Sequence, residues 1–221
     1  MEKIRKIESL YENYDALIIR CVPDYQKILQ VITENINDAD GEILDIGIGT
    51  GNLEKFIFQK FTEAKIIGVD TSLYFLNEAK AKFSNRKFKT VWADIRNYQM
   101  KKNKFDKILA SLAIHHFEDN EKIKLFQDIY QALTENGIFI NFDMIKPKTE
   151  TELLKSKEKL FKKWKTEGLS NSFIEKEKKE MVKRDRLVEL SKQKEWLEKI
   201  GFTFKVIYKK RLFCVYMCKK Q

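Results

Sequence analysis

Short apolar runs alternate with amphipathic segments along most of the chain. Nearly continuous runs of apolar residues occur at 42–47, 65–70, 88–94, 105–114 and 137–145, and such runs are typical of strands that are buried on both faces. Segments with the apolar spacing of helices separate most of them, at 53–61, 73–83 and 121–133. This alternation predicts an α/β fold with a doubly wound, mainly parallel sheet.

The two ends of the chain depart from this alternation. Residues 1–20 and 24–37 have helical patterns separated by Pro23, and we expect residues 1–37 to form an N-terminal helical lid. From about 149 to 195 a highly charged helical pattern predicts an insertion, or acceptor lid, within a single domain of residues 1–221. The segment 202–220 follows Gly201 and predicts two strands joined by a tight basic turn, an antiparallel finish to the sheet.

The net charge of +10 is concentrated in the last third of the chain. Up to residue 145 there are 20 Lys and Arg against 22 Asp and Glu, whereas from residue 146 there are 23 against 11. A basic region of this kind attracts nucleic acid or anionic substrates. However, its lysines are interleaved with glutamates at helical spacing, which is typical of a solvated helix surface, so nucleic acid is not the favoured partner.

The cysteine and hydropathy patterns favour a cytoplasmic protein without a membrane partner. No eighteen apolar residues run together, and the N-terminal residues lack the pattern of a signal peptide. The three cysteines are too few for a disulfide framework. Cys214 and Cys218 share one face of a strand without a nearby histidine, so we expect them to be buried and expect no metal site.

A glycine-rich turn, DIGIGTG at 45–51, follows the first strand and indicates a ligand site. Gly47, Gly49 and Gly51 allow a ligand to approach the backbone closely. Polar residues also end the following strands (Asp70, Asp94, Ser111), and the carboxyl ends of parallel strands meet at one edge of the sheet. Asn52 stands where a dinucleotide motif has its third glycine, and Asp45 would repel a diphosphate. A cationic, amino-acid-like ligand such as S-adenosylmethionine therefore fits better than NAD.

With DIGIGTG, GVDTS, WADI and FDKILASLAIHHF, the chain resembles the class I S-adenosylmethionine-dependent methyltransferases over most of its length. The resemblance implies a seven-stranded mixed sheet of order 3-2-1-4-5-7-6 with the last strand antiparallel. It also implies that the glycine turn receives the methionine portion, that Asp70 binds the ribose hydroxyls, and that Asp94 and Ile95 bind adenine. The cofactor-binding residues implied in this way are Tyr25, Asp45, Gly47, Gly49, Gly51, Asp70, Thr71, Asp94, Ile95, Ser111 and Leu112. Of these, Asp45 would lie near the cofactor's ammonium group, and Ser111 and Leu112 would lie under the methionine.

Within that family, RCVPDYQ at 20–26 and the C-terminal strands are similar to carboxy-S-adenosylmethionine synthases, which act in tRNA modification, and to their methyltransferase relatives. This similarity implies that Tyr25 contacts the cofactor. Two positions depart from the synthase pattern. Ser111 replaces an Asn, and Lys178 or Lys179 replaces the Arg that holds the extra carboxylate, although lysine lacks the bidentate geometry of arginine. Ordinary methyl transfer is therefore the expected chemistry.

His115 and His116, the only two histidines, are the candidate catalytic residues because they follow the fourth strand beside the expected methyl group. A histidine there can take a proton from an acceptor near neutral pH. In an extended segment adjacent side chains point in opposite directions, so we expect at most one to face the acceptor. Further candidates for the acceptor pocket are Tyr11, Tyr14, Asp15, Arg20 and Asp143.

The function predicted from the sequence is methyl transfer from S-adenosylmethionine to a small-molecule acceptor. A tRNA-modification enzyme and a non-catalytic adenosylmethionine-binding regulator remain open as alternatives. The sequence indicates neither the acceptor atom nor the oligomeric state, because this fold supports methylation of O, N, C and S atoms.

Overall fold

A single seven-stranded sheet organises the computed structural model, which describes residues 14–220. The strand order is β3-β2-β1-β4-β5-β7-β6. Strands β1 to β5 pair in parallel, and β7 runs antiparallel to both of its neighbours. The strands are β1 (Glu42–Ile46), β2 (Lys65–Asp70), β3 (Phe88–Trp92), β4 (Phe105–Ser111), β5 (Leu133–Met144), β6 (Phe202–Lys210) and β7 (Phe213–Lys220).

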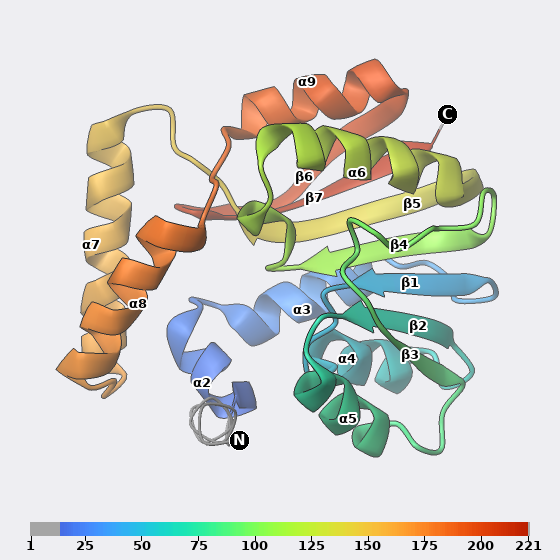
Figure 1. Ribbon diagram of the computed structural model, residues 1–221, viewed down its shortest axis with the longest axis horizontal. Helices are drawn as coiled ribbons and strands as arrows, with labels where there is room; N and C mark the ends of the chain where they lie inside the picture. The colour runs from blue at the N-terminus through green and yellow to red at the C-terminus, as the bar shows by residue number, and fades with distance from the viewer. Residues whose placement is uncertain (1–13, 221) are drawn as a thin grey trace.

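Helices cover both faces of the sheet, as Figure 1 shows. One face carries α3 (Tyr25–Glu34), α4 (Asn52–Lys60) and α5 (Leu73–Lys82), and the other carries α6 (Asp119–Ala132) and α9 (Leu190–Ile200). Each layer has its own apolar core. Ile28 and Ile57 belong to the first core, whereas Phe126 and Leu197 belong to the second. Burial of these apolar helix faces against β-strands is the main favourable contribution to folding.

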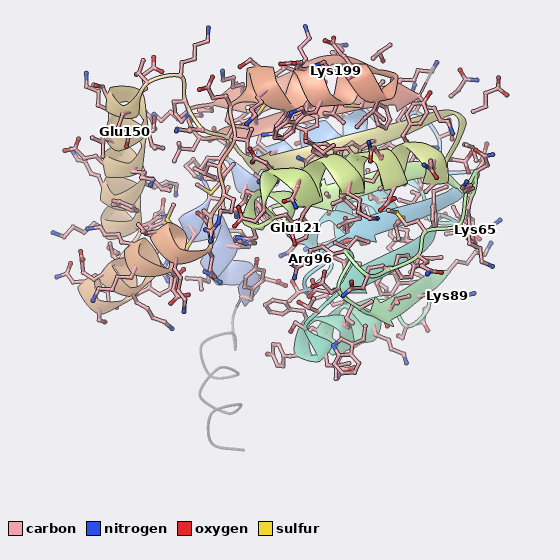
Figure 2. All side chains as sticks on the ribbon, turned by 45° about the horizontal axis from the view of Figure 1, so that its top comes forward. Lys65, Lys89, Arg96, Glu121, Glu150 and Lys199 are labelled. Atoms are coloured by element: carbon pink, nitrogen blue, oxygen red, sulfur yellow. The ribbon has the colours of Figure 1, made fainter. Side chains whose placement is uncertain are left out.

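Three further helices lie outside these layers, beside the carboxyl ends of the parallel strands (Figure 1). They are α2 (Tyr14–Cys21) and the two lid helices, α7 (Glu150–Thr166) and α8 (Asn171–Arg184). Figure 2 labels Glu150 at the start of α7 and Lys199 near the end of α9. The two residues show that the lid lies apart from the helices that cover the sheet. The Lys146 amide donates to the Val188 carbonyl at 3.0 Å, which joins the two ends of the lid segment at its base.

Side-chain hydrogen bonds connect α2 to α7. Arg20 Nη2 donates to the Glu167 carbonyl at 2.6 Å, and Trp164 Nε1 donates to the Cys21 carbonyl at 2.7 Å. At the other end of α2, Asp15 accepts hydrogen bonds from Thr50 Oγ1 at 2.5 Å and from Asn52 Nδ2 at 3.0 Å. The N-terminal helix therefore contacts both the lid and the glycine turn.

The predicted fold class, strand order and antiparallel finish are confirmed. The insertion was predicted to reach residue 195, but residues 190–195 belong to α9, whose Leu197 is buried in the core of the sheet. Strand β4 also ends at Ser111 rather than at residue 114. Leu112 adopts a positive φ of 56°, which takes the chain out of the strand and into the 3₁₀ helix η1 (Ile114–His116).

One further expectation concerns the burial of the cysteines. Cys214 and Cys218 are both buried in the second core, as predicted. Across residues 14–220, none of the helices is both long enough and apolar enough to cross a membrane.

Candidate functional site

A cavity of about 590 Å³ lies between the carboxyl ends of β1, β2 and β4 and the lid helices. Its volume is in the range of small-molecule and cofactor sites, roughly 300 to 1,000 Å³. Eight of the predicted cofactor residues line it: Gly47, Gly49, Asp70, Thr71, Asp94, Ile95, Ser111 and Leu112. The motifs that follow successive strands in the sequence therefore meet at one site.

The glycine turn has one position that is open to a ligand. All three of its glycines have positive φ, which disfavours other residues. A Cβ on Gly49 would meet no atom within 4 Å, and Gly49 lines the cavity. A Cβ on Gly51 would lie 2.5 Å from Phe83 Cε2, and Gly51 does not line the cavity but caps α4. The predicted role of Gly51 in cofactor binding thus stays a prediction, and its lack of a side chain leaves room for the ring of Phe83.

Asp70 is placed to bind a ligand and to shape the turn. Its Oδ2 accepts a hydrogen bond from the Gly49 amide at 2.9 Å, and its Oδ1 accepts one from the Ser72 amide at 2.8 Å. Each carboxylate oxygen accepts more than one hydrogen bond, so both retain capacity for a pair of ligand hydroxyl groups. This geometry fits the ribose of S-adenosylmethionine.

Asp94 lies on the cavity wall but is engaged by Arg96, which the sequence did not indicate. The guanidinium contacts both oxygens of Asp94, at 2.5 Å for Nη2 to Oδ2, and also reaches Glu121 Oε1 at 2.9 Å (Figure 2). Hydrogen bonding to Arg96 lowers the pKa of Asp94. An adenine amino group that bonds to Asp94, as predicted, must share the carboxylate oxygens with Arg96. Ile95 also lies on the cavity wall, and Arg96 does not occupy its backbone groups.

Asp45 and Tyr25 were predicted to contact the cofactor, but neither lines the cavity. Asp45 is buried beside Glu54, and burial together with this neighbour raises its pKa well above the usual range. Apart from each other, Asp45 Oδ1 and both Glu54 oxygens have no hydrogen-bond partner among the described residues. Tyr25 is buried in the first core, with its ring 6.4 Å from that of Phe142. Both side chains thus lie behind the cavity wall, because the strand and helix that carry them direct them into the core.

His115 and His116 both line the cavity, which corrects the expectation that at most one would face the acceptor. They lie in a 3₁₀ helix rather than in an extended segment, and their ring centroids are 3.9 Å apart. The buried Asp143 does not line the cavity but forms a short hydrogen bond with His115 Nδ1. Burial lowers the pKa of His115, yet the charge and hydrogen bond of Asp143, with a contribution from Asp185, outweigh burial and raise it overall.

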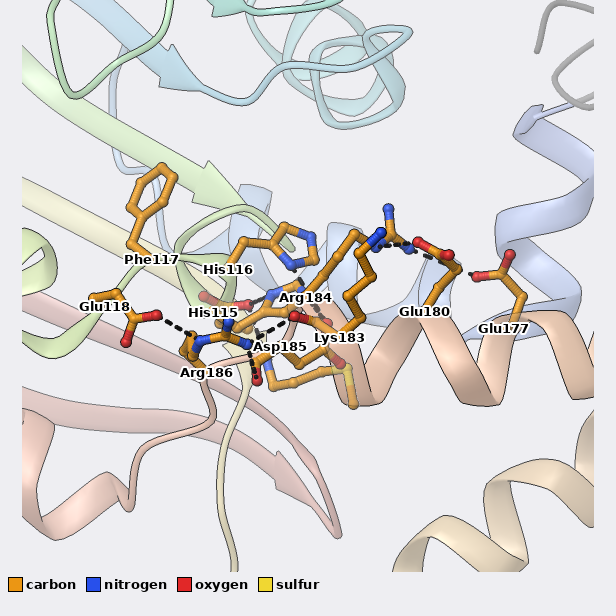
Figure 3. Close-up of polar contacts among 12 residues, drawn as sticks. His115, His116, Phe117, Glu118, Glu177, Glu180, Lys183, Arg184, Asp185 and Arg186 are labelled. Carbon is orange, nitrogen blue, oxygen red and sulfur yellow. Dashed lines mark hydrogen bonds and ion pairs between the residues drawn. The ribbon is translucent and has the colours of Figure 1, made fainter.

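Asp185 joins the two histidines although it lies far from them in sequence. It follows α8 directly, and its Oδ1 lies 3.4 Å from His116 Nδ1 and 3.9 Å from His115 Nε2 (Figure 3). In the sequence Asp185 stands within the charged stretch KRDR, which has the pattern of a solvated surface. No sequence signal distinguishes it from the other acidic residues of the lid.

The lid and α2 supply a wall opposite the glycine turn that mixes apolar and charged side chains. Its apolar members include Tyr14, Leu17, Cys21, Leu160, Trp164, Phe173 and Met181, and α8 adds the charged Lys176, Glu177, Glu180 and Arg184. Burial raises the pKa of the Cys21 thiol to about 11, so the cysteine is a neutral part of this wall. Of the other predicted acceptor residues, Arg20 bonds to α7 and Asp15 to the glycine turn, while Tyr11 lies outside the described residues.

One arginine of the lid reaches the cavity. Lys178 and Lys179, which the sequence placed at the position of a carboxylate-binding arginine, do not line the cavity. Lys178 pairs with Glu175 at 2.7 Å instead. Arg184 does line the cavity, and it is held by Glu180 at 3.4 Å and more loosely by Glu177 at 3.8 Å.

Comparison with known proteins agrees with this geometry. Residues 43–137 match the family model described as a methyltransferase domain. The chain is 32% identical over 130 residues to trans-aconitate 2-methyltransferase of Escherichia coli, covering 59% of this chain and 47% of that protein. It is 27% identical over 137 residues to carboxy-S-adenosyl-L-methionine synthase of Helicobacter hepaticus, covering 58% and 56%. The chain therefore spans about half the length of the curated relatives it matches.

Solved structures share the fold. Phosphoethanolamine N-methyltransferase 2 of Haemonchus contortus, in complex with S-adenosyl-L-methionine, superimposes with a TM-score of 0.62 at 19% identity. The match covers 89% of this chain and 52% of that one. The fold predicted from the sequence is confirmed by the strand order and by this structural likeness. Residues 43–137 are thus similar to a methyltransferase domain, in agreement with the family that the sequence predicts.

Proposed function

We propose that this protein transfers a methyl group from S-adenosylmethionine to a small-molecule acceptor bound in the cavity. The observation that carries the proposal is the division of the cavity into two walls. The glycine turn, Asp70 and Ile95 form a wall that suits the cofactor, and the lid with α2 forms the wall opposite it, where apolar side chains of α2 and α7 meet charged side chains of α8. An acceptor with an apolar part, a polar or charged part and one nucleophilic atom would fill the remaining space.

Bound S-adenosylmethionine supplies an electrophilic methyl group whose sulfur leaving group is already positively charged. The new bond forms between the acceptor atom and the methyl carbon while the carbon–sulfur bond breaks, and the acceptor gives up its proton. The chain therefore has to align the acceptor and exclude water. His115 and His116 remain proposed catalytic residues because both side chains line the cavity beside Ser111 and Leu112.

The lid favours a small molecule over tRNA. A nucleic-acid base needs an open entrance beside a continuous basic surface. Here α2 and α7 are joined over the cavity by the hydrogen bonds of Arg20 and Trp164. Lysines of the lid also form ion pairs with neighbouring glutamates, as Lys163 does with Glu167 at 2.9 Å. These pairs interrupt the positive surface that a phosphate backbone would follow.

A second candidate function is suggested by Arg184. Carboxy-S-adenosyl-L-methionine synthase is among the relatives, and a guanidinium can bind a carboxylate through two parallel hydrogen bonds. The sequence has lysines at positions 178 and 179, where the synthase pattern has an arginine. Arg184 lines the cavity and could take the place of that arginine. Either an acceptor or a modified cofactor that carries a carboxylate would be compatible with this side chain.

The test is transfer of isotope-labelled methyl groups. The protein is incubated with methyl-labelled S-adenosylmethionine and, separately, with a small-molecule extract or total tRNA, and products are separated by mass. We expect labelled small molecules and stoichiometric S-adenosylhomocysteine, both abolished in Asp70→Asn. Label in tRNA at physiological salt would favour the RNA enzyme, a carboxylated cofactor product would favour the synthase, and tight cofactor binding without any product would favour a regulator.

A further inference from the structure

We propose that His115, His116 and Asp185 bind a divalent transition-metal ion on the acceptor side of the cavity. The three side chains come from two distant segments, η1 after β4 and the residue that follows α8 (Figure 3). Their potential ligand atoms all lie within 4.8 Å of one another. All three residues line the cavity, so an ion held there would be accessible to the acceptor.

The distances are close to those that one ion requires. Metal–ligand bonds of about 2.0 to 2.2 Å to nitrogen and oxygen put neighbouring ligand atoms roughly 3 to 3.5 Å apart. The separation of His116 Nδ1 from Asp185 Oδ1, 3.4 Å, already satisfies this. His115 Nε2 lies 3.9 Å from the same oxygen, and all the ligand atoms lie within 4.8 Å of one another, so the side chains must draw closer around an ion. Asp185 directly follows α8, so the position of this lid helix determines where the third ligand lies relative to the two histidines.

Asp143 supplies the support that metal-binding histidines usually have. It is buried in β5 and bonds to His115 Nδ1, which leaves Nε2 directed toward Asp185 and the cavity. Carboxylates that hold the second ring nitrogen of a ligand histidine fix both its tautomer and its orientation. If His115 were only oriented by Asp143, the carboxylate of Asp185 near its Nε2 would have no explanation.

The charge balance also favours a cation. The Asp185 side chain is only 8% exposed, and no Lys or Arg in residues 14–220 forms an ion pair with it. Neighbouring cations are engaged elsewhere: Arg184 with Glu180, Arg186 with Glu118, and Lys122 with the carbonyls of Phe117 and Arg186. A buried carboxylate is costly unless a positive charge compensates it.

The donor set selects the kind of ion. Two imidazoles and one carboxylate favour Zn²⁺, Fe²⁺ or a similar transition metal over Mg²⁺ and Ca²⁺, which prefer oxygen ligands. Three protein ligands leave coordination positions open toward the cavity. The role of the ion rests on the proposed function: it would bind an oxygen or nitrogen atom of the acceptor and hold that atom in front of the cofactor.

The experiment measures metal binding directly, without cofactor or acceptor. Tag-free protein is treated with a chelator, dialysed and titrated with Zn²⁺ and Co²⁺, using calorimetry and the visible absorption of protein-bound Co²⁺. We expect one equivalent to bind. His116→Ala and Asp185→Asn should each weaken binding at least about tenfold, and Asp143→Asn about tenfold to a hundredfold. Glu175→Gln, which changes a lid carboxylate that pairs with Lys178 outside the cavity, should bind the ion as the native protein does.

Two outcomes would overturn the metal site. One is failure of the folded native protein to bind either ion stoichiometrically, and the other is unchanged affinity in both His116→Ala and Asp185→Asn with native circular dichroism. The site and the proposed function fail separately. Ion binding that depends on these residues supports the site even if no methyl acceptor is found, whereas methyl transfer by a protein that binds no ion removes the site and leaves the function.

Discussion

Gly49 and Gly51 offer a matched pair of substitutions that tests where the cofactor lies. Both residues have positive φ, 57° and 80°, so an alanine at either position is strained in the same way. They differ in their surroundings. A Cβ on Gly49 would project into free space at the cavity, whereas a Cβ on Gly51 would lie 2.5 Å from the ring of Phe83.

These surroundings predict that Gly51→Ala is the less stable variant and that Gly49→Ala is the weaker binder of the cofactor. Left-handed backbone costs a non-glycine residue roughly 1 to 2 kcal/mol, and this cost applies to both variants. Gly51→Ala additionally displaces a ring in the core, and overpacking of this kind costs roughly 1 to 3 kcal/mol more. Gly49→Ala avoids that second cost but fills space that the bound cofactor needs. We expect its affinity for S-adenosylmethionine to fall at least about tenfold, a loss of about 1.4 kcal/mol.

Urea denaturation gives the free energy of unfolding, and calorimetry on the folded variants gives the affinity for S-adenosylmethionine. Gly51→Ala should be the less stable variant and should keep nearly native affinity, while Gly49→Ala should be the more stable variant and the weaker binder. Native affinity in Gly49→Ala would refute the placement of the cofactor against the open face of this turn. If both folded variants lost affinity for S-adenosylmethionine equally, backbone strain rather than contact with the cofactor would be the cause.

Three further predictions test other parts of the site. Asp70→Asn loses the negative charge and one acceptor oxygen, so calorimetry should show at least about tenfold weaker S-adenosylmethionine binding; unchanged affinity would contradict the ribose assignment. Glu54 and Asp45 have raised pKa values in the folded state, so their contribution to stability is present below the unfolded values of 3.8 to 4.5 and is lost as the pH rises. Other carboxyl groups, such as Asp24 and Asp38, have lowered pKa values with the opposite effect, so the test compares two proteins. In urea unfolding, Glu54→Gln should lose less stability than the native protein from acidic toward neutral pH; the same pH dependence in both would argue against the buried pair. Trp164→Ala removes the hydrogen bond to the Cys21 carbonyl and a buried ring, so limited proteolysis should cut the lid faster; a lid as resistant as the native one would show that this contact does not hold it.

The sheet and the cofactor wall could be predicted from the sequence because their signals are local. Buried parallel strands appear as short apolar runs, and strand order followed from the resemblance that DIGIGTG and GVDTS carry. Asp70 ends β2 and Gly49 lies three residues after the end of β1, and the carboxyl ends of these strands meet at one edge of the sheet. The geometry of that edge brings them together whatever the rest of the chain does.

The structure differs from the sequence-based expectation where a side chain's direction depends on tertiary packing. Asp45 was expected near the ligand because it adjoins the glycine turn, and its side chain points into the core toward Glu54. The two histidines were treated as part of an extended segment, whereas the positive φ of Leu112 starts a 3₁₀ turn that places both on the cavity wall. Arg184 and Asp185 were undetectable, since nothing in a charged helical pattern shows which residue at its end faces inward.

The two walls of the cavity come from different parts of the chain, and this has a consequence for identifying the acceptor. The family match ends at residue 137, before the lid helices that form the wall opposite the glycine turn. The relatives' acceptors are therefore weak guides to the acceptor of this protein, and the lid side chains are better ones. The walls are nevertheless connected through α2, where Asp15 bonds to Thr50 of the glycine turn and Arg20 bonds to α7. Because one helix contacts both, a lid substitution that loosens α2 also disturbs the turn, so changes in acceptor preference can be assigned to the lid only when cofactor affinity is measured in the same variant.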